Sequence, residues 1–277
     1  MTRGPVAPNA PDDRRRLDGT NGAAGTLTED CSGEKAPVEL RPEEIGLFLD
    51  VDGTLLDLAP HPDAVAVPVG LIHALAAAER RLAGALALIS GRTIAALDRL
   101  FAPLKLRASG VHGAEIRCGR NGAGRMPRER RMPPRAWPEL VRLLDRFPGT
   151  FAEDKGAGFA VHYRMASCSA EELGAALAGL VAAFASSELE LVGGNLVFEI
   201  RRPGFDKGTA IETFMTKAPF FERRPVFIAD DPMDRAGFDA ALAHGGLAYS
   251  VGRELPGLSG CFSEPAAVRA WLGRFGG

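Results

Sequence analysis

Carboxylates gather at two places in the sequence where an apolar run ends. Asp50 and Asp52 close the first strongly apolar run and are followed by Gly53. Asp230 and Asp231 close a second run, much later in the chain. Burying carboxylates at strand ends is costly unless a cation or hydrogen-bond donors compensate. Two runs that both end in carboxylates therefore predict a hard-cation site between them, and oxygen ligands favour Mg²⁺.

A hydroxyl and an ammonium complete a set suited to phosphoryl transfer. Ser90, followed by Gly91 and Arg92, ends another apolar run, where a hydroxyl and free N–H groups suit a phosphate. Lys207 opens a helical stretch and can place positive charge against a developing oxyanion. Taken alone, Ser90 is equally well explained as a helix cap and Lys207 as a surface lysine. The order of acid pair, serine, lysine and acid cluster, each at the end of an element, indicates the chemistry.

Composition describes an ordinary globular chain. It has 277 residues, a formal net charge of −2, 46% hydrophobic and 25% charged residues. This balance gives no overall attraction to nucleic acid or anionic membrane, and no apolar run is long enough to span a bilayer. The cysteines show no CxxC pair, which excludes a zinc ribbon and a dense disulfide framework. We expect four reduced thiols in a cytoplasmic protein, at Cys31, Cys118, Cys168 and Cys261.

The elements that must position these residues alternate between short apolar strands and helices, the pattern of βαβ units. We therefore expect a doubly wound α/β domain with a parallel sheet. The expected strands cover 45–52, 85–90, a segment ending near Val111, 225–230 and 247–251, and the expected helices cover 69–81, 93–101, 207–217, 233–243 and 265–275.

An insert interrupts this pattern between 112 and 204. Segments 158–164 and 195–201 alternate polar and apolar residues, and amphipathic helical stretches cover 137–147 and 170–184. This predicts an inserted α+β domain whose antiparallel sheet packs on helices. The first residues have too little apolar content to offset chain entropy. The expected organisation is a disordered tail at 1–40, a core domain at 41–111 and 205–277, and the insert at 112–204.

The acid pair, Ser90, Lys207 and the second acid cluster together resemble the four motifs of the haloacid dehalogenase (HAD) superfamily of phosphatases, which has a Rossmann-like core. Further matches resemble its trehalose-6-phosphate phosphatase family. These matches are 86–92, Gly110–Glu115, Glu153–Lys155, His162–Arg164, Val197–Ile200 and Lys207-Gly208.

The resemblance implies a Mg²⁺-dependent phosphoric monoester hydrolase of trehalose biosynthesis that converts trehalose 6-phosphate to trehalose and phosphate. Asp50 would be the nucleophile that forms an aspartyl-phosphate, and Asp52 the general acid and base. Asp50, the backbone carbonyl of Asp52, and Asp230 would hold Mg²⁺. Ser90 and Lys207 would hold the transferring oxygens. A trehalose-6-phosphate synthase is a possible pathway partner.

The insert then resembles a cap that closes over the sugar. The resemblance implies that Glu153, Lys155 and Glu199 bind the glucose hydroxyls. Charged residues that alternate along a sheet are equally well explained as its solvated face, so both interpretations stay open. Substrate contact is further implied for Arg92. Substrate contact or a hinge function is implied for three residues at the junction of core and cap, which are His112, Gly113 and Glu115.

The last motif departs from the family's pattern. Ala229, Met233 and Arg235 stand where the family has Gly, Thr and Glu, which puts metal affinity and turnover rate in question. Asp231 and Asp234 precede a helix, so capping or support of the metal ligands is an alternative to ligation. The departures motivate one rival function, a catalytically weakened sugar-phosphate sensor. The other rivals are a phosphatase for another sugar phosphate and a phosphomutase of similar architecture.

Overall fold

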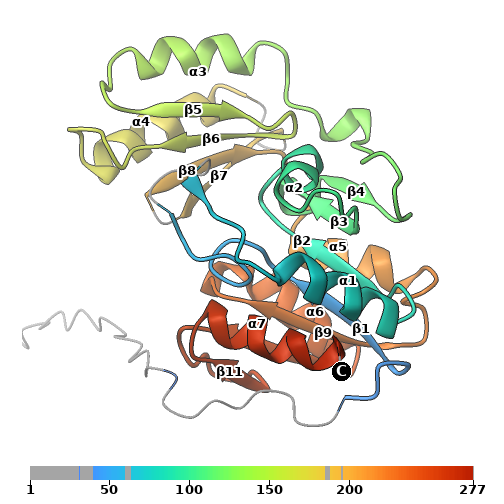
Figure 1. The fold of residues 1–277 in the computed structure, drawn as a ribbon. Coiled ribbons are helices and arrows are strands. Elements are labelled where there is room, and N and C mark those ends of the chain that lie inside the picture. Colours follow the sequence, from blue (N-terminus) through green and yellow to red (C-terminus); the bar gives the residue numbers. More distant parts are fainter. Residues whose placement is uncertain (1–30, 32–39, 60–63, 185–187, 195, 277) are drawn as a thin grey trace, which may run out of the picture.

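The chain forms two sheets, one above the other in Figure 1. The computed structural model describes residue 31 and residues 40–59, 64–184, 188–194 and 196–276. The predicted disordered tail at 1–40 lies outside the described residues, apart from Cys31 and Leu40. None of the helices in the described ranges is long and apolar enough to cross a membrane.

The larger sheet contains seven strands among the described residues, in the order β11-β10-β9-β1-β2-β3-β4. Neighbouring strands pair in parallel, except that β4 is antiparallel to β3. The strands are β1 (Ile45–Leu49), β2 (Leu86–Ile89), β3 (Arg107–Gly110), β4 (Glu115–Arg117), β9 (Arg224–Ala229), β10 (Leu247–Val251) and β11 (Gly260–Phe262).

Helices cover both faces of this sheet, which confirms the predicted doubly wound α/β core. Helices α1 (Leu71–Arg81) and α7 (Pro265–Gly273) contact each other on one face, and α2 (Ile94–Leu100) lies by β3 and β4. Helices α5 (Lys207–Met215) and α6 (Arg235–Ala243) contact each other on the opposite face (Figure 1). Because both faces are covered, every residue of β1 is buried, as its unbroken apolar run predicts.

The strand order places a topological switch beside β1. The chain moves from β1 to β2 and β3 on one side, and from β9 to β10 and β11 on the other. In open α/β sheets, a crevice forms beyond the carboxyl ends of the strands at such a point. The carboxyl ends of β1, β2 and β9 therefore meet at one edge of the sheet, where ligands bind.

The insert supplies the second sheet, which is antiparallel with the order β5-β6-β8-β7. Its apolar face packs on α3 and α4, with Phe159, Val161 and Ile200 buried among helix residues such as Leu140 and Leu177. The elements are α3 (Ala136–Leu144), β5 (Phe151–Asp154), β6 (Gly158–His162), α4 (Ala170–Ala182), β7 (Glu190–Gly194) and β8 (Val197–Arg201).

The junction between core and insert lies further along the chain than the expected boundary at 112. Short 3₁₀ turns at Val111–Gly113 and Arg128–Arg130 flank β4 in the sequence. Strand β4, expected in the insert, pairs with β3 at the edge of the core sheet. The insert's own sheet begins only at Phe151.

The prediction of four reduced thiols is wrong, because Cys31 and Cys261 form a disulfide. Their Cα atoms lie 6.2 Å apart, within the range that a disulfide spans. Cys118 and Cys168 are free thiols. The two bonded cysteines are 230 residues apart in the sequence, so spacing carries no signal of their pairing.

Phe48 is the aromatic centre of the core, and its truncation is expected to destabilise the fold. Its fully buried ring lies 4.9 Å from the ring of Phe220 and 5.9 Å from that of Phe214, centroid to centroid. Phe48→Ala should lower the free energy of unfolding by about 3–5 kcal/mol, since it removes buried contacts and leaves a cavity. Urea denaturation followed by circular dichroism measures this loss.

Val69→Ala is the matched control, because Val69 is fully exposed and its truncation should change the free energy of unfolding by less than about 0.5 kcal/mol. Equal losses for the two variants would contradict the assignment of Phe48 to the core.

Candidate active site

Three carboxylates converge at the switch point. Asp50 follows β1 directly, Asp230 follows β9, and Asp234 ends the 3₁₀ turn Pro232–Asp234. One oxygen of each lies within 4.8 Å of the other two, and Asp50 and Asp234 are buried. The two predicted acid clusters therefore meet. Asp234, for which the sequence left capping, support of the metal ligands and direct ligation open, stands in the same cluster as Asp50 and Asp230.

Lys207 provides the positive charge inside this cluster. It is the first residue of α5, and its buried Nζ lies 3.0 Å from Asp50 Oδ1 and 2.7 Å from Asp234 Oδ2. Burial alone would lower the pKa of Lys207, but the two aspartates raise it above its ordinary value. The lysine is therefore held protonated, with its ammonium directed at Asp50.

The cluster has more negative than positive charge. Burial raises the pKa of Asp50 well above its usual value, with Asp234 and Asp230 adding to the shift and Lys207 opposing it. Burial and Asp234 likewise raise the pKa of Asp230, again against Lys207. Three carboxylates and one ammonium leave two negative charges when all are ionised. A divalent cation with a preference for oxygen ligands fits this donor set.

Gly53 and Thr54 allow the two strand ends to approach each other. Gly53 has a φ of +77°, and a Cβ at this position would overlap the Asp230 carboxylate. Thr54 is buried, and its Oγ1 donates to Asp230 Oδ1 at 3.3 Å. The glycine in the first motif is therefore required by both backbone conformation and space.

Asp52 is held by an arginine from the second strand end. Arg92 donates from Nε and Nη2 to the two carboxylate oxygens of Asp52, each at 2.7 Å. The Arg92 backbone N–H donates to Ser90 Oγ at 3.1 Å, so the serine organises its own loop. The structure thus places Arg92, an expected substrate contact, against the expected general acid.

Two of the three residues that depart from the family's last motif lie at the surface, away from this cluster, whereas Ala229 is buried at the end of β9. Met233 is exposed, and Arg235 pairs with Asp239 on the exposed side of α6. Asp231 caps the turn that follows it, since its Oδ1 accepts from the Met233 backbone N–H at 2.9 Å. Asp234 makes no such side-chain cap, because its carboxylate points to Lys207.

The junction residues fit closely against the core loops. A Cβ on Gly91 would overlap the His112 ring, and a Cβ on Gly113 would overlap the Asp206 carbonyl oxygen, just before Lys207. Glu115 accepts from the Ile94 backbone N–H at 2.8 Å, so its carboxylate anchors the start of α2. Of these expected substrate contacts, Glu115 therefore has a clear structural partner in the core.

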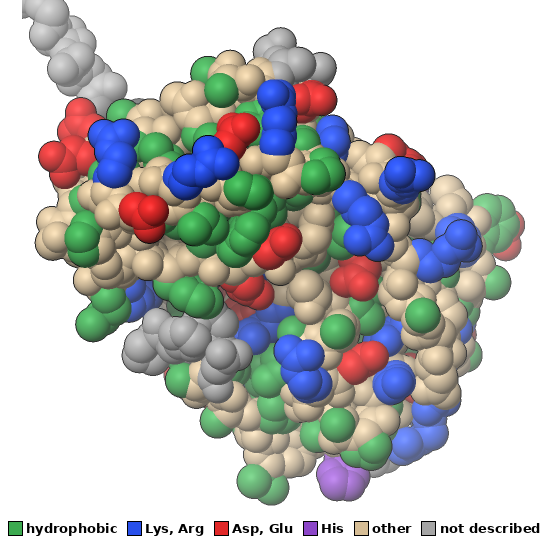
Figure 2. Space-filling model, turned by 90° about the horizontal axis from the view of Figure 1, so that it is seen from above, with side chains coloured by type: hydrophobic (Ala, Val, Ile, Leu, Met, Phe, Trp, Pro, Cys, Tyr) green, Lys and Arg blue, Asp and Glu red, His purple; other side chains and the backbone are tan. Residues whose placement is uncertain are grey.

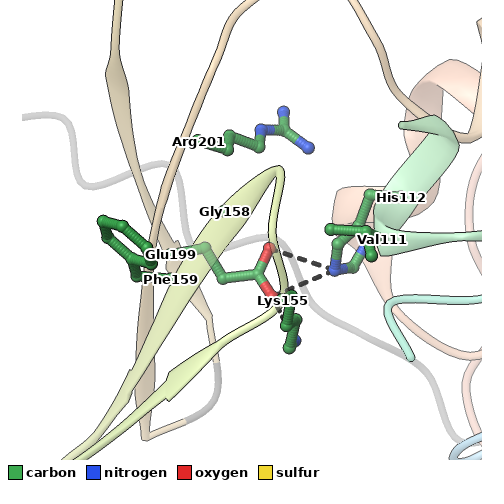
Figure 3. A pocket seen from close by; sticks show the side chains of 7 residues that line it. All are labelled: Val111, His112, Lys155, Gly158, Phe159, Glu199 and Arg201. Atoms are coloured by element: carbon green, nitrogen blue, oxygen red, sulfur yellow. Dashed lines mark hydrogen bonds and ion pairs between the residues drawn. The ribbon is translucent and has the colours of Figure 1, made fainter. Parts of the chain in front are cut away.

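His112 also connects the core to the cap sheet. Its Nε2 lies 3.1 Å from Glu199 Oε1 and 3.0 Å from Oε2, and Lys155 Nζ donates to Oε1 at 3.1 Å (Figure 3). Burial alone would raise the pKa of Glu199, but His112 and Lys155 hold it well below its usual value. Glu199 is thus an ionised acceptor between two cationic or hydrogen-bonding groups.

Glu153 lies in the same row of the cap sheet, because it pairs with Ala160, which in turn pairs with Glu199. Its Oε2 lies 3.9 Å from His162 Nε2. His162, and then Lys155, lowers the pKa of Glu153 below its usual value. The three residues expected to bind sugar are therefore brought together on one face of the sheet.

This charged face of the cap sheet looks toward the core. The side chains of Lys155 and Glu199 are only 12% and 18% exposed, whereas that of Glu153 is 41% exposed. The alternative interpretation of these charges as a solvated face therefore does not fit Lys155 and Glu199, whose side chains are mostly buried. On the outer face shown in Figure 2, acidic and basic side chains are interspersed, in keeping with the balanced composition.

The pocket between the cap and the junction includes residues that sequence reasoning missed. Besides His112, Lys155 and Glu199, four more residues line it (Figure 3). Of these four, only Arg201 carries a signal in the sequence, because it stands two positions after Glu199 and side chains alternate along β8. The four are Val111, Gly158, Phe159 and Arg201.

Comparisons with known proteins agree on one family. The trehalose-phosphatase family model matches residues 48–254. A probable trehalose-phosphate phosphatase from Sinorhizobium fredii is 39% identical over 221 residues, covering 80% of this chain and 83% of that protein. The trehalose-6-phosphate phosphatase of Escherichia coli is 35% identical over 227 residues, covering 81% of this chain and 84% of that protein.

Solved structures show the same fold at lower identity. A trehalose-6-phosphate phosphatase related protein superposes with a TM-score of 0.70 and 22% identity, covering 83% of this chain and 96% of that one. A phosphatase of the haloalkanoate (HAD) enzyme superfamily from Bacteroides thetaiotaomicron superposes with a TM-score of 0.56 and 16% identity, covering 87% of this chain and 99% of that one. The family match runs from β1 past β10 and so includes the three strand ends that build the site. The chain therefore belongs to the trehalose-phosphatase family and is a phosphatase of the hydrolase class.

Proposed function

We propose that this protein hydrolyses trehalose 6-phosphate to trehalose and phosphate, through an aspartyl-phosphate on Asp50 and with Mg²⁺ as cofactor. The observation that carries this proposal is the cluster of Asp50, Asp230, Asp234 and Lys207 at the carboxyl ends of the core strands, together with the pocket that His112, Lys155 and Glu199 line between the core and the cap. The similarity to trehalose-6-phosphate phosphatases supports the choice of substrate.

Asp50 is the proposed nucleophile. Its carboxylate oxygen attacks phosphorus, and the bond from phosphorus to the sugar oxygen breaks. A water molecule then attacks the aspartyl-phosphate and releases phosphate, so that one difficult step becomes two. Lys207, 3.0 Å from Asp50 Oδ1, favours the ionised carboxylate and offers positive charge to the transferring oxygens. Ser90, at the end of β2, is proposed to contact the same oxygens.

Asp52 is the proposed general acid and base. It would give a proton to the leaving sugar oxygen and later take one from the attacking water. The bidentate contact with Arg92 fixes both oxygens of Asp52 in the structure described here. Arg92 occupies one lone pair on each of these oxygens, so each oxygen keeps a second lone pair that can carry the transferred proton.

Asp50, Asp230 and the backbone carbonyl of Asp52 are the proposed Mg²⁺ ligands, with Asp234 adjacent and also bonded to Lys207. When bound, the cation would offset the repulsion between a carboxylate and a phosphate dianion. Arg235 does not oppose this arrangement, because it pairs with Asp239 at the surface. Of the two residues that motivate a weakened sensor, Met233 and Arg235, the charge reversal at Arg235 therefore no longer argues for it.

The insert is proposed to act as a cap over the sugar, on a core that comprises 41–111, strand β4 and 205–277. Glu153, Lys155 and Glu199 would hydrogen-bond the glucose hydroxyls. His112 shares Glu199 with Lys155, so a sugar hydroxyl would have to displace or join the imidazole.

A place in trehalose biosynthesis follows from the proposed substrate, which a trehalose-6-phosphate synthase would supply. A cytoplasmic location stays a prediction. The Cys31–Cys261 disulfide does not support it, since disulfides persist mainly in oxidising compartments.

Asp50→Asn should abolish turnover and leave the fold intact, because an amide oxygen is a poor nucleophile. The expected loss in kcat is about a hundredfold or more, or ~2.7 kcal/mol. Phosphate release from trehalose 6-phosphate measures it, and circular dichroism checks the fold. Asp145→Asn, at the exposed end of α3, is the control and should keep full activity. Retention of a few per cent of activity by Asp50→Asn would contradict the covalent mechanism.

Removal of divalent ions by EDTA should stop phosphate release, and added Mg²⁺ should restore it. Mg²⁺ should also raise the Tm of the protein, since it binds the folded cluster and offsets the repulsion among buried carboxylates. Asp230→Asn should reduce that rise in Tm, which differential scanning fluorimetry measures. Full activity in the presence of EDTA would argue against the cofactor.

Glu153→Ala should weaken hydrolysis of trehalose 6-phosphate far more than hydrolysis of p-nitrophenyl phosphate, which has no sugar. Loss of a hydrogen bond to a charged group predicts a rise in KM of about 10- to 100-fold for the sugar phosphate alone. Glu171→Ala, exposed on α4 of the same insert, is the matched control. An equal loss of activity on both substrates would contradict a role of Glu153 in sugar recognition. A panel of sucrose, glucose and mannose phosphates separates the rival substrates.

A further inference from the structure

Strand β8 carries a second charged side chain on the face that holds Glu199. Side chains alternate along a strand, so Arg201 shares the face of Glu199, while Phe198 and Ile200 pack in the apolar core of the cap. Both Glu199 and Arg201 line the pocket. In Figure 3 their side chains extend from the strand in the same direction, toward the side on which His112 lies.

Arg201 is held in place from the neighbouring strand. Its Nε donates to Glu190 Oε1 at 2.7 Å, and the two residues are paired in register between β7 and β8. On the other side, β6 places Gly158 opposite Arg201, and a Cβ there would lie 3.3 Å from the Arg201 Cβ. The absent side chain at Gly158 therefore leaves room for the arginine to lie along the pocket wall.

The contact with Glu190 uses Nε, the inner nitrogen of the guanidinium, and among the described residues it is the one hydrogen bond that the Arg201 side chain makes. A guanidinium has five N–H donors in a planar fork, and only the Nε donor is used by Glu190. The Nη donors can therefore bind two neighbouring oxygens of a ligand. Glu190 also balances the charge of Arg201, so the fork does not require an anionic partner.

We propose that Arg201 is a further sugar-binding residue, which donates to adjacent hydroxyls of the sugar while Glu199 accepts from them. Each hydroxyl both donates and accepts, so a pocket wall with a carboxylate acceptor beside a guanidinium donor matches a vicinal diol. Sites built to hydrogen-bond a hydroxyl discriminate strongly against ligands that lack it. Arg201 would thus determine specificity for polyhydroxylated leaving groups. This proposal rests on the proposed function as a sugar phosphatase.

A purely structural role for Arg201 makes a different prediction. A cross-strand ion pair of this kind contributes little to stability, and its loss alone would not change KM for the sugar phosphate selectively. Steady-state kinetics of three variants therefore distinguish the two roles, with trehalose 6-phosphate and p-nitrophenyl phosphate as substrates. The variants are Arg201→Gln, Arg201→Lys and Glu190→Gln. Arg41→Gln, which breaks an exposed arginine–glutamate pair elsewhere, is the control.

Arg201→Gln should raise KM for the sugar phosphate about tenfold or more, a factor typical of one lost charged hydrogen bond. The kcat for the sugar phosphate, the kinetics with p-nitrophenyl phosphate and the Tm should change little. Arg201→Lys should recover only part of the affinity, because an ammonium lacks the planar fork. Glu190→Gln should raise KM less than Arg201→Gln, since it loosens the arginine and keeps its donors.

An unchanged KM in Arg201→Gln, beside a raised KM in Glu199→Gln, would overturn the proposal and leave the proposed function standing. Activity of the wild type on another sugar phosphate but not on trehalose 6-phosphate would overturn the substrate assignment, and the same variants would then be judged on that substrate. Calorimetry measures the binding of trehalose directly and so tests sugar recognition independently of turnover. Wild type that neither hydrolyses a sugar phosphate nor binds trehalose would overturn both.

Discussion

Three carboxylates share a buried site with one ammonium, and this imbalance of charge sets the conditions that the surrounding structure meets. Lys207 contacts Asp50 and Asp234, which keeps the cluster together when its residues come from separate parts of the chain. The switch in strand order brings the ends of β1 and β9 side by side, and Gly53 removes the side chain that would keep them apart. The strand order, the glycine and the lysine contacts thus each help to bring the three carboxylates into one cluster.

The core and the cap meet through a short segment with unusual backbone geometry. Val111, His112 and Gly113 all have positive φ values, of 48°, 50° and 108°. A β-branched residue rarely adopts this conformation, and such strain persists only where the surroundings fix it. Here the His112 ring packs on Gly91, and its Nε2 reaches Glu199 on the cap. The same residue therefore touches the phosphate-side loop and the sugar-side sheet, which makes it the physical link between the two halves of the proposed substrate site.

A structural feature can be predicted from the sequence where the residues of one element determine it. It cannot be predicted where contacts between residues distant in the sequence determine it. The unbroken apolar runs before Asp50, Ser90 and Asp230 are enough to predict three buried strands and the edge on which their polar ends meet. By contrast, β4 and β11 have three residues each, and β7 ends in two glycines, so none carries a clear period. The disulfide and the place of Asp234 beside Lys207 depend on contacts across the fold. Arg201 joins the pocket only through its register with Glu190 and Gly158.

The positions of the side chains after β9 explain why changes in the last motif do not have to weaken the chemistry. Met233 and Arg235 lie on the surface of the turn and helix after β9, whereas Asp230 and Asp234 from the same segment point into the cluster. The charge reversal at Arg235 is met locally by Asp239, one helical turn further on. In the proposed function, recognition of the leaving group is assigned to the cap face with Glu153, Glu199 and Arg201, which shares no residue with the carboxylate cluster. Substrate range can therefore change through the cap while the groups that act on phosphorus stay the same.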